Sequence, residues 1–163
     1  LAYNIMFGPD YERGACPGCS MVGDELGATL VHLNHRDVTV ICFSRAPIDR
    51  LIAYKKRMDW QFPYVSTNGT EFPFDFGLAL TPEQAQEIPE VKETLENPPE
   101  WLEDWGRQVG AKLEDGMREN PSFIAFARDW YAERARRLET GEELVQLEDD
   151  DASGGETRLG PAG

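Results

Sequence analysis

Apolar residues in the first 66 positions alternate between short dense runs and longer periodic stretches. Dense runs at residues 3–7, 38–43 and 62–66, each followed by turn-forming residues, indicate buried strands. Between them, apolar residues recur at helical spacing over residues 19–33, and a second helix is expected over residues 47–58. This order of strand, helix, strand, helix and strand predicts an α/β fold with a central, mainly parallel sheet.

Both predicted helices have one apolar face. In the second helix we expect Ile48, Leu51 and Ile52 to point toward the core. In the first helix Gly23 and Gly27 each cost about 1 kcal/mol relative to Ala, so that helix is predicted from its apolar stripe more than from propensity. The stripe consists of Cys19, Val22, Leu26, Leu30 and Leu33.

The chain becomes helical in character after residue 80. Residues 81–84 (Thr-Pro-Glu-Gln) have the sequence of a capping box with proline at the first helical position. Asn97 and two prolines end that helix, and Trp101, Trp105, Val109 and Leu113 then follow four apart. We expect this aromatic face to pack against the sheet, within a helical insertion at about residues 81–120. The short run at residues 123–126 fits a strand or a helical stripe equally well.

Charge is concentrated in two parts of the chain. The 163 residues have a formal charge of −14. Residues 82–120 carry 11 acidic and 4 basic side chains, and residues 139–163 carry 8 acidic side chains and 1 basic one. Residues 141–163 contain too little apolar surface to offset the entropy of ordering them, so we expect an acidic disordered tail after a domain at residues 1–140. The acidity disfavours nucleic acid and anionic membrane surfaces as partners, and no apolar run approaches the roughly 20 residues of a membrane helix.

The candidate chemistry lies in a Cys-x-x-Cys motif between the first predicted strand and the first predicted helix. Amide groups and the dipole at a helix start stabilise an anion, so a cysteine there has a lowered pKa and becomes a nucleophile. We expect Cys16 to lie just ahead of the helix and stay exposed, and Cys19 to face the core. Pro17 and Gly18 support the pair, since Pro17 fixes the backbone where no N–H donor is needed. This asymmetry suits disulfide exchange, with Cys16 attacking and Cys19 resolving the mixed disulfide.

Three other interpretations of the motif stay open. Zinc coordination would add His32 and His35, but only two residues separate these histidines, and a helix would place Cys19 and His32 roughly 20 Å apart. We expect both histidines to face solvent. A structural disulfide or a pair of inert thiols is the second alternative. A thiol peroxidase, which also uses a cysteine at a helix start, is the third. Cys42, inside an apolar strand, is expected to be a packing residue.

Five short blocks of sequence occur in a distinctive order. They are Met-Phe-Gly-Pro-Asp at 6–10, Cys-Pro-Gly-Cys at 16–19, His-Leu-Asn-x-Arg-Asp-Val-Thr at 32–39, Ser-Arg-Ala-Pro at 44–47 and Phe-Asp-Phe-Gly at 74–77. Together they resemble the thioredoxin-like domain of unknown function 899 family, described as predicted dithiol-disulfide oxidoreductases. The likeness covers about residues 1–125 and implies a thioredoxin-like sandwich in which Cys16 and Cys19 are the redox pair. Peroxiredoxins, with Pro-x-x-x-Thr-x-x-Cys before their nucleophile, are a weaker match.

The sequence departs from that pattern at both ends. Members carry an additional N-terminal segment, and thioredoxin-like folds place a cis-proline turn opposite the cysteines, whereas here no proline lies between Pro121 and Pro161. We therefore expect a domain incomplete at both ends, from a truncated or frame-shifted product.

The sequence thus predicts an oxidoreductase for disulfides that needs no bound cofactor or metal. Its partners would be a disulfide substrate and an external thiol reductant, in the cytoplasm. The non-enzymatic alternative is a thioredoxin-like binding domain with inert cysteines.

Overall fold

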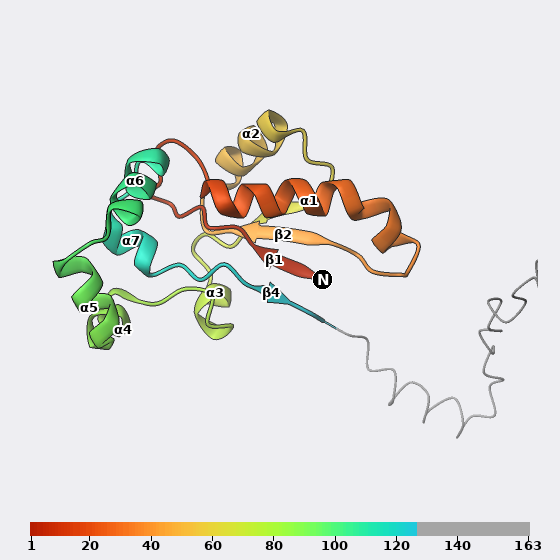
Figure 1. Cartoon of the computed structure of the whole chain (residues 1–163). Coiled ribbons are helices and arrows are strands. Elements are labelled where there is room, and N and C mark those ends of the chain that lie inside the picture. Colours follow the sequence, from red (N-terminus) through yellow and green to blue (C-terminus); the bar gives the residue numbers. More distant parts are fainter. Residues whose placement is uncertain (127–163) are drawn as a thin grey trace, which may run out of the picture. The chain divides into compact units, whose positions relative to one another are not determined.

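A four-stranded sheet lies at the centre of the structure, a computed structural model that describes residues 1–126 (Figure 1). The strands are β1 (Ala2–Asn4), β2 (Ile41–Ser44), β3 (Tyr64–Ser66) and β4 (Phe123–Ile124), in the order β3-β2-β1-β4. β1 pairs in parallel with β2, and β2 with β3, whereas β4 runs antiparallel to β1. The predicted α/β class is confirmed, but the sheet is mixed and not mainly parallel. The prediction failed because the run at residues 123–126 did not reveal whether it would enter the sheet.

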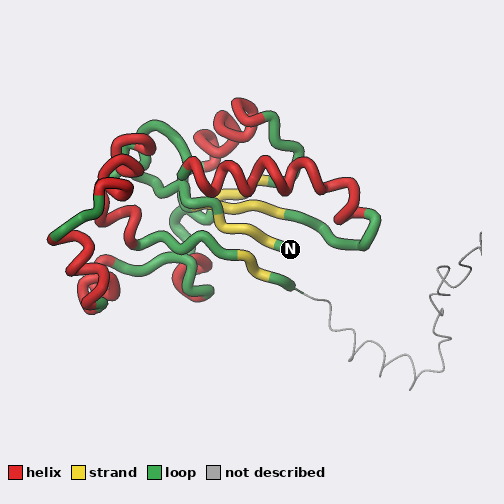
Figure 2. The backbone as a smooth tube through the Cα atoms, in the orientation of Figure 1, coloured by secondary structure: helices red, strands yellow, loops and turns green. Residues whose placement is uncertain are grey.

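Seven helices surround this sheet in the described part of the chain. Helices α1 and α2 lie along one side of the sheet and α3 on the other, while α4 to α7 gather beyond one end of it (Figures 1 and 2). Their bounds are α1 (Pro17–Asn34), α2 (Ile48–Met58), α3 (Phe72–Asp75), α4 (Pro82–Glu87), α5 (Pro89–Glu96), α6 (Glu100–Val109) and α7 (Leu113–Met117).

Both faces of the sheet carry buried apolar residues. Tyr3, Cys42 and Tyr64 contribute to the larger core cluster together with residues of α1 and α2. Ala2 and Phe43, on the opposite face, belong to a smaller cluster against which Phe72 of α3 packs. Burial on two faces explains why the first strands appear in the sequence as almost continuous apolar runs.

Several local predictions are confirmed. The hydroxyl of Thr81 accepts a hydrogen bond from the backbone N–H of Gln84, whose side chain accepts one from the Thr81 N–H, which completes the capping box of α4. Cys19 and Leu26 of the α1 stripe are buried, while Val22, Leu30 and Leu33 are partly buried and pack against the same core cluster.

Two predictions about helix faces are wrong. Ile48 and Ile52 are exposed (50% and 61%), because α2 turns Leu51 and Tyr54 toward the core instead. Trp101 is also exposed (66%), since α6 buries the neighbouring face formed by Leu102, Gly106 and Val109. The end of the predicted domain at residues 127–140 and the predicted acidic tail at 141–163 lie outside the described residues.

Candidate functional site

The cysteine pair lies where the chain leaves β1 and begins α1. The backbone N–H of Cys16 donates a hydrogen bond to the Met6 carbonyl (2.8 Å), which ties the start of the helix to the segment that continues β1. The Cys16 carbonyl accepts the first helical hydrogen bond from Ser20 (2.9 Å), and Pro17 occupies the first helical turn. The sequence therefore placed Cys16 correctly, immediately ahead of the helix.

The two cysteines have different environments. Cys16 is half-buried, so the prediction that it stays exposed is only partly correct. Cys19 is buried, as predicted from its place on the α1 stripe, with 4% of its surface exposed. An alanine Cβ at position 18 would lie 4.0 Å from the Cys16 sulfur, which is ordinary contact, so Gly18 is not needed to give the sulfur space.

Hydrogen bonds separate the pKa values of the two thiols. The pKa of Cys16 is lowered to about 5, chiefly by a hydrogen bond with the Cys19 side chain. The backbone of Cys19 and the side chain of Trp105 add to this effect, while burial opposes it. The pKa of Cys19 is raised, first by its side-chain hydrogen bond with Cys16 and then by burial. The arrangement provides a thiolate at Cys16 and keeps the proton on Cys19.

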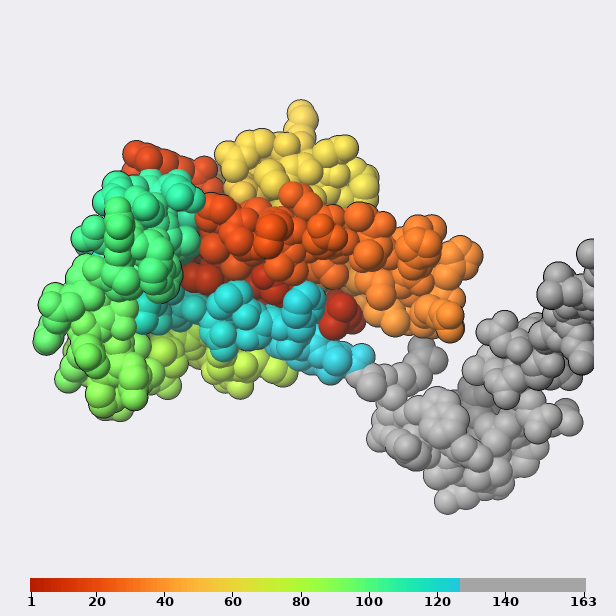
Figure 3. All heavy atoms as spheres, viewed as in Figure 1, coloured from red at the N-terminus to blue at the C-terminus, as the bar shows by residue number. Residues whose placement is uncertain are grey.

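Two aromatic residues that sequence analysis did not assign to the site contact the pair. Tyr3, in β1, shares a hydrogen bond with the Cys19 side chain. Trp105 comes from α6 and packs against the same core cluster as Cys16. In the space-filling view the residues of α4 to α7, coloured green to teal, form one mass beside the red and orange atoms of the first part of the chain (Figure 3). The four-residue spacing of apolar positions predicted that Trp105 lies on the apolar face of a helix. That spacing could not indicate that the Trp105 indole would reach the cysteines.

A cavity of about 300 Å³ opens beside Cys16. Most of its lining is apolar and comes from the segment after β1, from α6 and from α7. Its two ionisable lining groups are the Cys16 thiol and the carboxyl of Glu119. The lining residues are Met6, Cys16, Trp101, Leu102, Trp105, Gly116, Met117 and Glu119.

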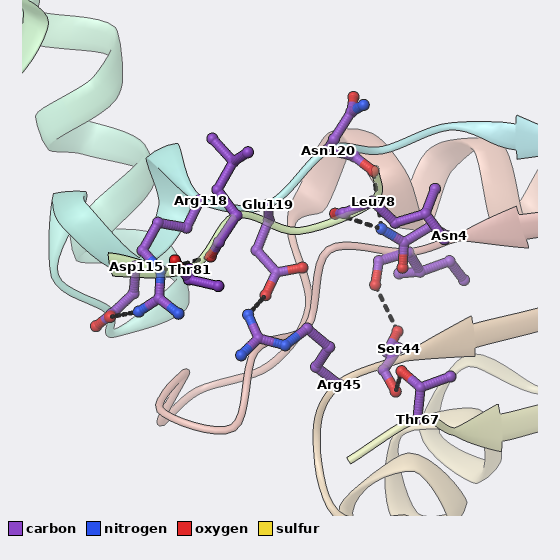
Figure 4. Close-up of polar contacts among 12 residues, drawn as sticks. Asn4, Ser44, Arg45, Thr67, Leu78, Thr81, Asp115, Arg118, Glu119 and Asn120 are labelled. Carbon is purple, nitrogen blue, oxygen red and sulfur yellow. Dashed lines mark hydrogen bonds and ion pairs between the residues drawn. The ribbon is translucent and has the colours of Figure 1, made fainter. Parts of the chain in front are cut away.

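Glu119 is held at the rim of the sheet by an ion pair with Arg45 (2.8 Å; Figure 4). The side chains of Arg45 and Glu119 are 17% and 2% exposed, so this ion pair is largely buried. Burial raises the pKa of the Glu119 carboxyl, against the lowering effect of Arg45. The second carboxylate oxygen, Oε2, has no hydrogen-bond partner among the described residues.

Polar contacts, buried or partly buried, fix the backbone on both sides of Glu119 (Figure 4). The Asn4 amide donates hydrogen bonds to the carbonyls of Asn120 (2.8 Å) and Leu78 (3.4 Å). The Arg118 guanidinium donates to the Leu80 carbonyl (2.9 Å). The position of Glu119 relative to β1 is thus determined by contacts between segments far apart in the sequence.

The remaining candidate residues lie away from the pair or are inert. Both His32 and His35 are exposed and lie at the end of α1, at the opposite end of this 18-residue helix from Cys16. Within residues 1–126, no three or more histidine, cysteine or acidic side chains are arranged to hold a metal ion. Cys42 is fully buried as expected, and burial raises the pKa of its thiol to about 12.

Fold and site define an α/β protein with a cysteine pair at the turn from its first strand to its first long helix. A family model described as "Bacterial protein of unknown function (DUF899)" matches residues 1–147, and the chain belongs to that family. The match extends beyond the roughly 125 residues over which we recognised its motifs. No curated protein and no solved structure matches the chain. Among residues 1–126, no helix has the length and apolar character of a membrane span.

Proposed function

We propose that this chain is a dithiol-disulfide oxidoreductase, with Cys16 as the nucleophile and Cys19 as the resolving cysteine. The observation that carries the proposal is the opposite shift of the two thiol pKa values in one Cys-x-x-Cys motif, downward at the half-buried Cys16 and upward at the buried Cys19. An attacking thiol must ionise and be accessible, whereas a resolving thiol is better kept protonated until a mixed disulfide has formed.

In this proposal the fold is thioredoxin-like. Support comes from the β1-α1-β2 unit with the cysteine pair at its first turn, and from the antiparallel β4 on the other side of β1. Helix cover on both faces of the sheet is also consistent with a sandwich (Figure 1).

The reaction would proceed in two exchanges. The Cys16 thiolate attacks one sulfur of a substrate disulfide, forming a mixed disulfide and releasing the first substrate thiolate. Cys19 then loses its proton and attacks the Cys16 sulfur, which forms the Cys16–Cys19 disulfide and releases the second substrate thiolate. The substrate gains two electrons, the two thiolates take up protons, and the protein dithiol is oxidised. An external thiol reductant would restore the dithiol, and we propose the reducing cytoplasm as the setting.

Insulin reduction with dithiothreitol as electron donor tests the proposal. We expect wild type and Cys42→Ala to accelerate precipitation of the insulin chains, and Cys16→Ser to abolish that acceleration. Reduced Cys19→Ser, mixed with insulin without dithiothreitol, should accumulate a mixed disulfide with the substrate, visible by mass spectrometry. If wild type is no faster than Cys16→Ser, the proposal is wrong.

The same proteins should be assayed for peroxide consumption. A thiol peroxidase would form a sulfenic acid at Cys16 and consume peroxide much faster than it reduces insulin. That result would assign the pair to the alternative chemistry, while inactivity in both assays would favour a binding domain.

A further inference from the structure

Cys16 shares its cavity with two tryptophans of one helix. Trp101 and Trp105 are four residues apart in α6, so they lie on the same face of that helix, one turn from each other. The Trp105 side chain forms a hydrogen bond with the Cys16 side chain, and both tryptophans line the cavity of about 300 Å³. Trp105 is partly buried, whereas Trp101 is 66% exposed. Trp101 therefore offers an accessible aromatic surface one helical turn from the indole that meets the reactive thiol.

The rest of the cavity lining is also largely apolar. It includes Met6, Leu102 and Met117. Glu119 lines it too, but only 2% of that side chain is exposed and its carboxylate is paired with Arg45, so it offers a ligand almost no polar surface. A methionine side chain is flexible, so such a lining adapts to apolar groups of different shape. An apolar group that enters this cavity would be removed from water.

Acidic residues predominate on the two helices that line the cavity. α6 carries three acidic side chains and one basic one, and α7 carries two acidic side chains and no basic one. Among the described residues, no arginine, lysine or histidine lines this cavity. Arg13 and Arg57 line a different pocket, which includes Pro17 but not Cys16. An anionic ligand would therefore be repelled by the helices and by the Cys16 thiolate, with no cation in the cavity to pair with.

We propose that the cavity binds an uncharged apolar side chain next to the substrate disulfide, and that Trp101 determines this specificity. The inference rests on the proposed function, since a disulfide attacked by Cys16 must bring the groups beside its sulfur atoms to this cavity. The volume of about 300 Å³ suits one side chain with its flanking amides. Because the two methionines adapt to shape, the preference is for apolar side chains as a class.

Four matched disulfides test the preference. They are the symmetrical disulfides of acetyl-Cys-X-amide, in which X is phenylalanine, leucine, serine or aspartate, so that only one side chain varies. Reduced protein is mixed with excess disulfide in the absence of another thiol, and formation of the Cys16–Cys19 disulfide is followed by acid quenching and mass spectrometry. Each rate constant is divided by that of dithiothreitol with the same disulfide, which removes differences in intrinsic reactivity.

Wild type should react about ten-fold or more faster with the phenylalanine and leucine peptides than with the serine peptide, because only the first two bury an apolar side chain. The aspartate peptide should be the slowest. Added NaCl should bring its rate closer to that of the serine peptide, since salt screens the repulsion. Equal normalised rates for all four peptides, or an aspartate peptide as fast as the phenylalanine peptide, would overturn the inference.

Substitutions of Trp101 test its part in this selection. We expect the preference for the phenylalanine over the serine peptide to fall below about three-fold in Trp101→Ala, and to be largely retained in Trp101→Phe, which keeps an aromatic ring. Trp101→Lys should lose the preference as well, and should also accelerate the aspartate peptide by supplying a cation. Ile52→Ala is the matched control and should keep the full preference, because Ile52 is similarly exposed (61%) but lies on α2 and does not line the cavity.

Thermal unfolding shows which variants fold, and either Trp101→Ala or Trp101→Lys suffices for the comparison. If wild type reduces insulin but does not distinguish the peptides, or if the folded variants keep the full preference, the specificity inference is wrong and the oxidoreductase proposal stands. If wild type reacts no faster than Cys16→Ser with the peptides and with insulin, both are wrong. A dimer in light scattering that Trp101→Ala dissociates would assign the exposed ring to a second copy of the chain and would likewise overturn the inference.

Discussion

The indole ring of Trp105 occupies the space that a side chain at position 116 would need. A Cβ atom built on Gly116 would overlap the six-membered part of that ring, which comes from a different helix. Glycine at this position therefore lets α7 approach α6 closely enough for the indole to lie beside Cys16. The contact connects the inserted helices to the chemistry of the cysteine pair, because the Trp105 side chain is one of the groups that lower the Cys16 pKa.

We predict that Gly116→Ala displaces Trp105 and raises the pKa of Cys16. Loss of one hydrogen bond to a charged group would change the thiol–thiolate equilibrium by roughly ten-fold, and the overpacked contact would cost about 1–3 kcal/mol of stability. The measurement is the rate of iodoacetamide alkylation of Cys16 as a function of pH.

Gly27→Ala is the matched control for that variant. Gly27 also lies in a helix, but a Cβ there meets no atom within 4 Å. It should leave the alkylation profile unchanged and stabilise α1 by up to about 1 kcal/mol. The same alkylation midpoint in Gly116→Ala and wild type would show that the indole contact does not matter for the thiolate.

Replacing Cys19 should also raise the pKa of Cys16, since the hydrogen bond with the Cys19 side chain is the largest cause of its lowering to about 5. In Cys19→Ala that donor is absent, whereas Cys19→Ser retains a hydroxyl donor at the same place. We expect a clear rise in the first variant and a smaller one in the second, measured by thiolate absorbance at 240 nm against pH. An unchanged titration in Cys19→Ala would contradict the assigned cause.

The lowered pKa of Cys16 also predicts a pH dependence of stability. Because the folded pKa of about 5 lies below the ordinary value of 9.0 for a thiol in the unfolded chain, the thiolate contributes stability that is present at high pH and is lost as pH falls toward 5. The difference in free energy of unfolding between reduced wild type and Cys16→Ser should therefore grow between pH 5 and 8.5. Oxidation of the pair to a disulfide should abolish this trend, because no free thiol then titrates.

The cysteine pair and its position were predictable because they depend on local sequence. A strand followed by a glycine- and proline-containing turn and an apolar stripe placed Cys16 ahead of a helix and Cys19 inside the core. The capping box at Thr81 is equally local. Each of these features is decided within one or two helical turns of chain.

The rest of the site depends on contacts between distant segments. Glu119 meets Arg45 across 74 positions, and Asn4 meets Asn120 across 116. Glu119 lies in a segment whose many acidic residues are mostly exposed, so nothing in the pattern separated it from them. The β4 strand could not be oriented from a run of four residues, which is why the sheet was predicted as mainly parallel.

Substitutions at two neighbouring positions of α2 test which of its side chains face the core, a point on which the structure and the sequence pattern disagree. Leu51 is fully buried and Ile52 is 61% exposed, although both were predicted to face the core. We expect Leu51→Ala to lower the free energy of unfolding by about 2–5 kcal/mol, and Ile52→Ala to change it by about 0.5 kcal/mol or less. Urea denaturation followed by circular dichroism provides both values, and similar losses in the two variants would mean that Ile52 faces the core as Leu51 does.

The Arg45–Glu119 pair predicts strongly non-additive effects on stability. Arg45→Met leaves the buried Glu119 carboxylate without its cation, which should cost about 3–5 kcal/mol near neutral pH. The double variant Arg45→Met/Glu119→Met removes both charges and should recover most of that loss, because apolar side chains of similar size can replace a buried pair.

The pH dependence of Arg45→Met separates loss of charge pairing from loss of packing. Burial already raises the pKa of Glu119, and removal of Arg45, which lowers it, should raise it further. A carboxyl whose folded pKa lies above its unfolded value binds its proton more readily when folded, so stability is gained as pH falls. Urea denaturation at pH 7 and at pH 5 should show Arg45→Met regaining stability relative to the double variant at the lower pH. A pH-independent difference between the two variants would mean that Arg45 stabilises this site through its packing over the Phe74 ring (5.2 Å to the ring centroid) and not through its charge.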